Sequence, residues 1–270
     1  MIHYQYDGTF EGLLTVVATA IEQDQAVEAI TAAAPVQPDL FAEYVTVTTD
    51  PDRAAELFAR LKAKFTAASL EFIGYSFLTE QPGIEKAIFD YIRLLFATRG
   101  QAARNFADPA VFRLQRASQQ VFHEIHRLHG FVRFRKLHSG LFYAPIEPDY
   151  AVVQFLAPHF TARFADQSWL IHDRKRNQGI YYDQRHCRYL SEVSTAFANG
   201  DPEGKRHGLS LFGYEAAEPD FQQLWNEYFH HIAIAERENR RAQRQRMPER
   251  YWRCLVEDVN GTKNCPKPVG

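Results

Sequence analysis

The chain has 270 residues, of which 46% are hydrophobic, 14% aromatic and 24% charged. This composition allows a sizeable core and excludes disorder as a class. No apolar run approaches the roughly 20 residues that cross a bilayer, and the start lacks the layout of a secretion signal, so we expect a cytoplasmic protein without membrane contact. The formal net charge is -2, so any attraction to nucleic acid must come from local patches.

The first hundred residues combine short strand patterns with amphipathic helices. Residues 3–7 alternate as a strand, and Thr9 can cap a helix that carries apolar residues at helical spacing. Residues 43–49 are β-branched and predict a second strand. Asp50 followed by Pro51 is typical of a helix start, and helices are expected over 51–67 and 82–98. The segment 1–100 is therefore predicted to be an N-terminal α/β region.

The apolar period is lost over 98–105, which we interpret as a linker or internal boundary. A helix near 109–129 is followed by a period of two from Phe131, and 138–140 suits a hairpin turn. Further elements are a helix near 149–164, strands near 169–172, 179–183 and 188–190, and a long helix from about Asp220 into the 240s. The predicted fold is α+β with a mainly antiparallel meander, a domain over 101–258 and a flexible tail over 259–270.

The continuation of the last helix is rich in arginine. Arginines at spacings of three and four share a helix face, and their planar guanidinium groups suit phosphate oxygens. Aromatic neighbours could stack on an unpaired base. The alternative is a solvated face with internal ion pairs and a buried Trp252. The nucleic-acid candidates here are Arg237, Arg241, Gln243, Arg244, Arg250, Tyr251 and Trp252.

A second basic element is expected on the first strand of the meander. Alternation places Arg133 and Arg135 on the face opposite Val132 and Phe134. Together with the arginine-rich helix they could form one positive groove. The alternative is the wet face of an antiparallel sheet, which often displays Lys and Arg.

Histidines supply the candidates for chemistry. His123, His126 and His129 are three apart on a helix, but they do not match the spacing of a catalytic zinc helix. The three cysteines form no close metal-binding pair, so we expect no metal and no cofactor. Weak acid–base candidates are His123 with Glu124, and His172 with Asp173 and Tyr181. A core or groove histidine is the competing interpretation of His172.

Five ordered blocks resemble one bacterial family. They are YDGTFEGLLTVV at 6–17, HEIHRLHGFVRFRKL at 123–137, GLFYAPIEPDY at 140–150, LAPHFTARFADQSWLIHD at 156–173 and NRRAQRQRMPERYW at 239–252. The family is named for DNA repair or DNA metabolism and is linked to a partner radical-SAM protein. Its C-terminal domain of unknown function also occurs fused to uracil-DNA-glycosylase-like domains, a fusion that we do not expect in this chain.

The resemblance implies a DNA-repair or DNA-metabolism accessory protein that binds single-stranded or damaged DNA and acts with a radical-SAM partner. Two alternatives remain. One is an enzyme that processes a nucleobase or phosphodiester with a His/Asp or His/Glu pair, and the other is a scaffold for the radical enzyme. The sequence does not decide whether the chain is itself catalytic.

Overall fold

The structure is a computed structural model that describes residues 2–32, 42–193, 217–218, 220–224, 245 and 247–256. The chain divides into two compact units, Met1–Phe122 and His123–Gly270. The division falls inside helix α5 (Pro109–Phe131), and each unit is described by itself.

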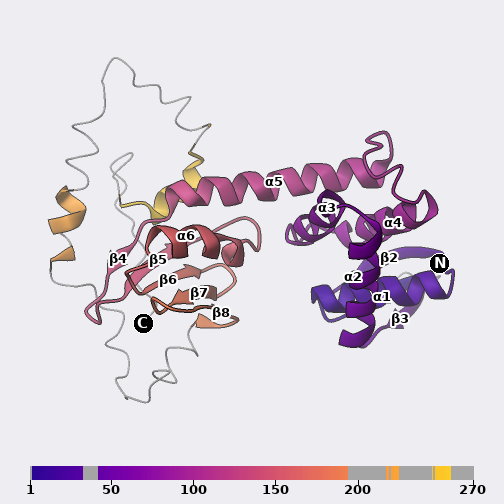
Figure 1. Cartoon of the computed structure of the whole chain (residues 1–270), viewed down its shortest axis with the longest axis horizontal. Helices are drawn as coiled ribbons and strands as arrows, with labels where there is room; N and C mark the ends of the chain where they lie inside the picture. The colour runs from indigo at the N-terminus through magenta and orange to yellow at the C-terminus, as the bar shows by residue number, and fades with distance from the viewer. Residues whose placement is uncertain are drawn as a thin grey trace. The chain divides into compact units, whose positions relative to one another are not determined.

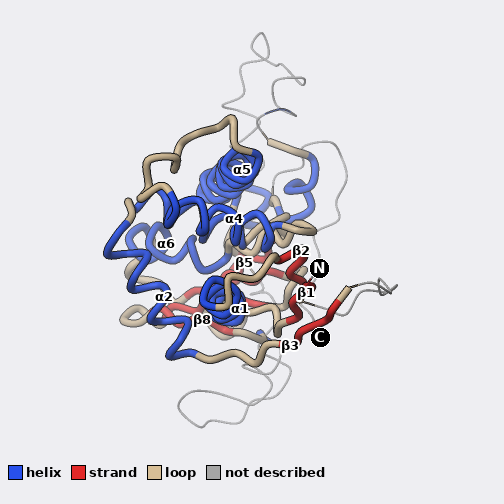
Figure 2. Tube along the Cα trace, turned by 90° about the vertical axis from the view of Figure 1, so that its right-hand side faces the viewer, coloured by secondary structure: helices blue, strands red, loops and turns tan. Residues whose placement is uncertain are grey.

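The first unit contains a parallel sheet with the strand order β2-β1-β3 (Figure 2). Helix α1 connects β1 to β2, which brings the second strand back in the same direction. The strands are β1 (Ile2–Gln5), β2 (Val27–Thr31) and β3 (Glu43–Thr46). The helices that follow in this unit are α1 (Phe10–Glu22), α2 (Pro51–Lys64), α3 (Ala67–Phe77) and α4 (Ile84–Ala97).

Both predicted helix starts in this unit have the expected caps. The Thr9 hydroxyl accepts a hydrogen bond from the Gly12 N–H at 2.9 Å. The Asp50 carboxylate accepts from the N–H groups of residues 52 and 53, both at 3.1 Å, and Pro51 is the first helical residue. These oxygens bind N–H groups that the first helical turn cannot satisfy itself. The apolar faces behind the caps, including Leu13 and Leu61, are buried in one core.

The second unit contains a five-stranded sheet with the order β4-β5-β6-β7-β8 (Figure 1). Its β5–β6 pair is parallel and its other pairs are antiparallel. The strands are β4 (Arg135–Lys136), β5 (Phe142–Ile146), β6 (Trp169–Asp173), β7 (Gln178–Tyr182) and β8 (Cys187–Leu190). The short helices of this unit are η1 (Val153–Leu156), α6 (Ala157–Arg163) and η4 (Glu249–Cys254).

The prediction of a mainly antiparallel meander is wrong. The fold is mixed α/β, with one parallel and one mixed sheet. The reason lies between β5 and β6, where η1 and α6 form a helical crossover. A crossover returns the chain to the same end of the sheet, so β6 runs parallel to β5. The expected hairpin β4–β5 and the three later strands are present at nearly the expected positions.

Other elements differ from the sequence prediction in extent. Strand β2 and helix α3 were not expected, and the helix expected over 149–164 is the shorter pair η1 and α6. Most of the expected arginine-rich helix lies outside the described residues, which include only 220–224 of its first part. Among the helices that the structure describes, none has the length and apolarity needed to cross a membrane.

Candidate functional site

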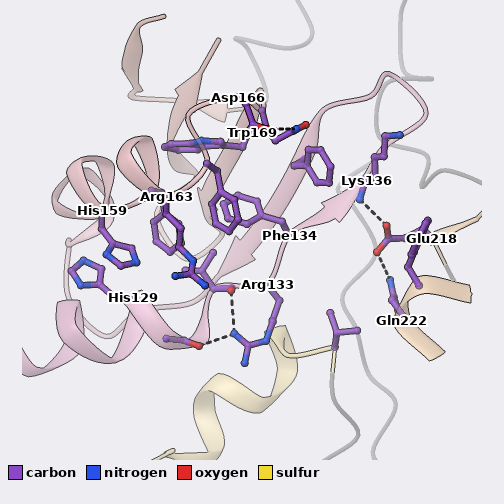
Figure 3. A pocket seen from close by; sticks show the side chains of 18 residues that line it. His129, Arg133, Phe134, Lys136, His159, Arg163, Asp166, Trp169, Glu218 and Gln222 are labelled. Carbon is purple, nitrogen blue, oxygen red and sulfur yellow. Dashed lines mark hydrogen bonds between the residues drawn. The ribbon is translucent and has the colours of Figure 1, made fainter. Parts of the chain in front are cut away.

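A cavity of about 1070 Å³ lies in the second unit (Figure 3). Its wall is built by the end of α5, the segment that leads into β4, strand β5, helix α6 and the start of β6. Aromatic and basic side chains dominate this wall. The lining residues include His129, Arg133, Phe134, Lys136, Phe142, His159, Phe160, Arg163, Phe164, Asp166, Trp169 and Glu218.

The floor of the cavity is aromatic. Phe160 and Trp169 are almost fully buried, with ring centroids 6.3 Å apart. Phe134 is half-buried and packs against both of them and against Phe164, at centroid distances of 5.3–6.1 Å. Helix α6 supplies Phe160 from its last turn and is followed directly by Phe164, so one short helix provides two of these rings. The cavity therefore offers flat apolar surfaces to a ligand.

Three basic side chains line the same cavity. Arg133 donates hydrogen bonds to the carbonyl oxygens of Gly130 and Val132, at 2.7 and 3.2 Å, and thereby helps to close the end of α5. Arg163 is exposed and lies over the Phe164 ring, with its guanidinium carbon 5.6 Å from the ring centroid. The third basic residue in the cavity wall is Lys136.

Two acidic side chains also line the cavity, but they are placed differently. Glu218 is buried, and its carboxylate accepts from the Lys136 N–H at 2.8 Å and from the Gln222 amide at 3.0 Å. Asp166 is exposed and accepts from the Gln167 amide at 3.3 Å. Figure 3 shows Glu218 directed toward the backbone of Lys136, so this carboxylate is engaged by the protein itself.

A pair of histidines forms part of the cavity wall. The rings of His129 and His159 are stacked, with centroids 4.2 Å apart and planes at 12° (Figure 3). Burial, followed by the charges of His159 and His126, lowers the pKa of His129 and so favours the neutral form of this ring. Among the described residues, its Nε2 is buried and has no hydrogen-bond partner.

The basic residues that the sequence suggested for one groove are not brought together. Arg133 lines the cavity, whereas Arg135 is fully buried and donates to the Cys254 carbonyl oxygen at 3.2 Å. The expectation that these two arginines share an exposed face is therefore corrected. Residues 132–134 are not in a strand, so the period of two does not run through them.

The C-terminal candidates divide in the same way. Arg250 forms an ion pair with Asp149 at 3.0 Å and lies over the Tyr251 ring at 4.7 Å. Tyr251 is 4% exposed, so its ring is not available as a surface for a base. Trp252 is half-buried, and its indole N–H donates a hydrogen bond to the Met247 carbonyl oxygen at 3.0 Å. The remaining candidates, Arg237, Arg241, Gln243 and Arg244, lie outside the described residues.

Glu124 is buried and fully engaged, while its neighbour His123 is exposed. The Glu124 carboxylate accepts from the N–H groups of Asp149 and Tyr150, at 3.0 and 2.9 Å, and from the Tyr251 hydroxyl at 2.8 Å. Glu124 thus joins α5 to the 149–150 loop and to η4. This arrangement is structural, because the oxygens that a general base would use already accept hydrogen bonds.

His172 and Asp173 point to separate networks. His172 is bonded to the Tyr143 hydroxyl at 2.9 Å and to Asn177 Oδ1 at 3.2 Å, and burial lowers its pKa to about 4. The buried Asp173 accepts from two N–H groups of the following turn and pairs with Arg176 at 3.2 Å. Burial raises the pKa of Asp173 despite this arginine.

Tyr181, the third member of that proposed acid–base set, is half-buried on β7 and packs at the margin of a small apolar cluster around Tyr143. These contacts bind the strands to one another. They favour the interpretation of His172 as a core residue whose ring nitrogens are both hydrogen-bonded. Within the part of the chain that the structure describes, no three His, Cys, Asp or Glu side chains gather in a way that could hold a metal ion.

Comparison with protein families identifies a match over most of the second half of the chain. A family described as a domain of unknown function, DUF4130, matches residues 82–257, which is more than half of the chain. The chain belongs to this family. The DUF4130 match includes every residue of the cavity, since these lie between 129 and 256. No curated protein and no solved structure matches this chain.

Sequence reasoning missed most of the cavity. The residues His159, Arg163, Phe164 and Trp169 were not singled out, because they come from a helix and a strand whose packing only the fold defines. The signal that could have found them is the mixture of aromatic and basic residues in HFTARF, over 159–164. Basic residues interleaved with aromatic ones are a recognised feature of surfaces that bind single-stranded nucleic acid.

Proposed function

We propose that this DUF4130 protein binds single-stranded DNA through the cavity at the end of α5. The observation that carries the proposal is an aromatic floor with three basic side chains in the same wall. Single strands are bound by surfaces of this kind, because aromatic rings stack on bases while Lys and Arg neutralise phosphates. Because the net charge is slightly negative, attraction to DNA would have to come from a local group of basic residues.

The charges around the cavity support an anionic ligand. Three basic residues, Arg133, Lys136 and Arg163, line the cavity against two acidic ones. Of the acidic side chains, the Glu218 carboxylate already accepts two hydrogen bonds from the protein. The exposed Arg163 extends from the cavity wall at the end of α6. An arginine at this position can bind a phosphate without breaking an ion pair on which the fold depends.

The proposal changes the interface that the sequence suggested. It keeps Arg133 and replaces the buried Arg135 and Tyr251 with Lys136, Arg163 and the aromatic floor. Arg250 is assigned to the support of the unit, because it is engaged by Asp149 and lies 3.7 Å from Glu124. The arginines of the 237–244 segment stay candidates for additional phosphate contacts.

The test is fluorescence anisotropy with a labelled single-stranded oligonucleotide and its duplex, over a series of salt concentrations. Each phosphate contact on a single strand contributes about 0.7 to the slope of log K against log salt. Replacing Lys136 and Arg163 together with Ala should therefore lower affinity and reduce the slope by about 1.4. Arg133 is retained in this variant because it closes α5.

Arg185→Ala is the matched control, since Arg185 is exposed in the same unit on the turn between β7 and β8. It should leave both affinity and slope near the values of the unaltered protein. An unchanged slope in the Lys136→Ala, Arg163→Ala variant would show that the cavity does not bind the phosphates. Far-ultraviolet circular dichroism of each variant checks that the fold is retained.

We further propose that this binding serves DNA repair or DNA metabolism in the cytoplasm, with a radical-SAM protein as the partner. The support is the resemblance of the five sequence blocks, which implies both. Size-exclusion chromatography of the purified chain with that partner and an oligonucleotide should give a ternary complex. Separate elution of the two proteins would contradict the partnership while leaving the DNA-binding proposal to its own test.

A further inference from the structure

We propose that the cavity receives one unstacked base of the strand, with the flanking phosphates held by Arg163 and Lys136. This inference rests on the proposed function and specifies how the same site holds its ligand. It assigns Phe134 as the principal stacking surface and the stacked His129 and His159 as the wall beside the inserted base.

The orientation of the rings supports a role for Phe134. Its plane is inclined by 77° to Phe160, by 75° to Phe164 and by 56° to Trp169. None of these three rings is stacked parallel on it, although all of them surround it. Phe134 is half-buried, whereas Phe160 and Trp169 are almost completely buried. The buried rings thus fix Phe134 in place, and a base can supply the parallel partner that these three rings do not give to Phe134.

The histidine wall adds a polar contact. His129 is held by its stacking on His159, and among the described residues its buried Nε2 lacks a hydrogen-bond partner. A buried polar atom without a partner costs free energy, which a ligand can recover. The edge of a base carries both donors and acceptors, so it can satisfy a neutral imidazole in either tautomer.

The size of the cavity fits a nucleotide with its neighbouring phosphates. Its volume of about 1070 Å³ is slightly larger than the range for drug-sized ligands, about 300–1,000 Å³, which leaves room for more than a base alone. Inside a duplex, however, both faces of a base are covered by its neighbours. A base must therefore be unpaired or turned out of the stack before Phe134 can contact its face. Single-stranded DNA satisfies this condition without the energy of unpairing.

The experiment compares a labelled single strand with the same strand in which the central residues are abasic. Both carry the same phosphates, so their difference in affinity measures insertion of the base. The abasic strand should bind the unaltered protein at least about fivefold more weakly, since stacking of one base contributes about 1–3 kcal/mol, which corresponds to a factor of about 5–150.

Two variants separate the roles of ring and charge. Phe134→Leu keeps an apolar side chain but removes the flat ring, so it should weaken binding of the normal strand and leave the abasic strand unchanged. The Lys136→Ala, Arg163→Ala variant should reduce the affinity for both strands by a similar factor. Phe112→Leu is the control, since Phe112 is 52% exposed on α5 in the other unit and should change neither.

The outcomes distinguish this inference from the proposed function. Equal affinity of the unaltered protein for the normal and abasic strands would overturn base insertion, while DNA binding itself would stand. If Phe134→Leu reduced the affinity for both strands equally, base insertion would also be overturned, because the ring would then support the fold of the cavity. Binding of neither strand by the unaltered protein would overturn the proposed function together with the inference.

Discussion

Replacement of Glu124 by Ala should strongly destabilise the unit His123–Gly270. Glu124 is 1% exposed, and its carboxylate is the acceptor for the N–H groups of Asp149 and Tyr150 and for the Tyr251 hydroxyl. The variant would leave these three donors without an acceptor inside the unit. Arg250 would keep its ion pair with Asp149 at 3.0 Å, so its charge would not be stranded.

The magnitude follows from the three donors. A donor that is buried and left unsatisfied costs about 1–3 kcal/mol. The bond from the Tyr251 hydroxyl is buried, whereas those from the N–H groups of Asp149 and Tyr150 are partly buried, so water entering the vacated space recovers part of their cost. We expect a loss of about 3–5 kcal/mol, similar to the effect of removing one partner from a buried ion pair. Glu124→Gln has nearly the same shape and keeps one oxygen acceptor, so its loss should be smaller, at about 1–3 kcal/mol.

Urea unfolding followed by tryptophan fluorescence measures this loss in the correct unit. The three tryptophans of the chain, Trp169, Trp225 and Trp252, all belong to His123–Gly270. Asp220→Ala, at an exposed position in the same unit, is the matched control and should stay within about 0.5 kcal/mol of the unaltered protein. A loss below about 1 kcal/mol for Glu124→Ala would refute the view that this carboxylate joins the three elements.

Two further predictions concern His172 and Gly12. Because burial lowers the pKa of His172 from 6.5 to about 4, its contribution to stability should be full above about pH 6.5 and fall by up to about 3 kcal/mol toward pH 4. Urea unfolding at several pH values should show this decline, and His172→Gln should flatten it. At Gly12 a Cβ would lie 2.3 Å from Asp7 Oδ1 and 2.8 Å from Thr49 Oγ1. Gly12→Ala should therefore destabilise the protein by about 1–3 kcal/mol, which a lower melting temperature measured by circular dichroism would show. Gly74→Ala, with open space on α3, should instead stabilise by up to about 1 kcal/mol, and equal effects of the two changes would contradict the steric argument.

Local chemistry made part of the fold predictable. Thr9 and Asp50 have the side-chain oxygens that a helix start requires, and both act as caps where the sequence indicated. The hairpin between β4 and β5 was also expected, and Gly140 at its turn has a positive φ of 82° that glycine adopts readily. These features depend on neighbours in the chain, so a local pattern is sufficient to find them.

Strand direction and site membership depend on contacts between distant segments. The short helices between β5 and β6 make that pair parallel, and no period within either strand encodes this direction. Glu124 was considered beside His123, its neighbour in sequence. Its actual partners are distant in the sequence: Asp149 is 25 residues away and Tyr251 is 127 residues away. Sequence adjacency therefore suggested a chemical pair where the fold built a structural one.

The same reasoning explains why the number of arginines in a segment is a poor guide to a binding surface. Arg135 and Arg250 are bonded within the unit, to the Cys254 carbonyl and to the Asp149 carboxylate, and so hold η4 against the rest of the unit. Arg163 comes from a segment with little excess of basic residues, yet it is exposed at the margin of an aromatic cavity. A guanidinium contributes to binding only where the fold leaves it available to a ligand and places complementary surfaces beside it. On that criterion the cavity is the stronger candidate.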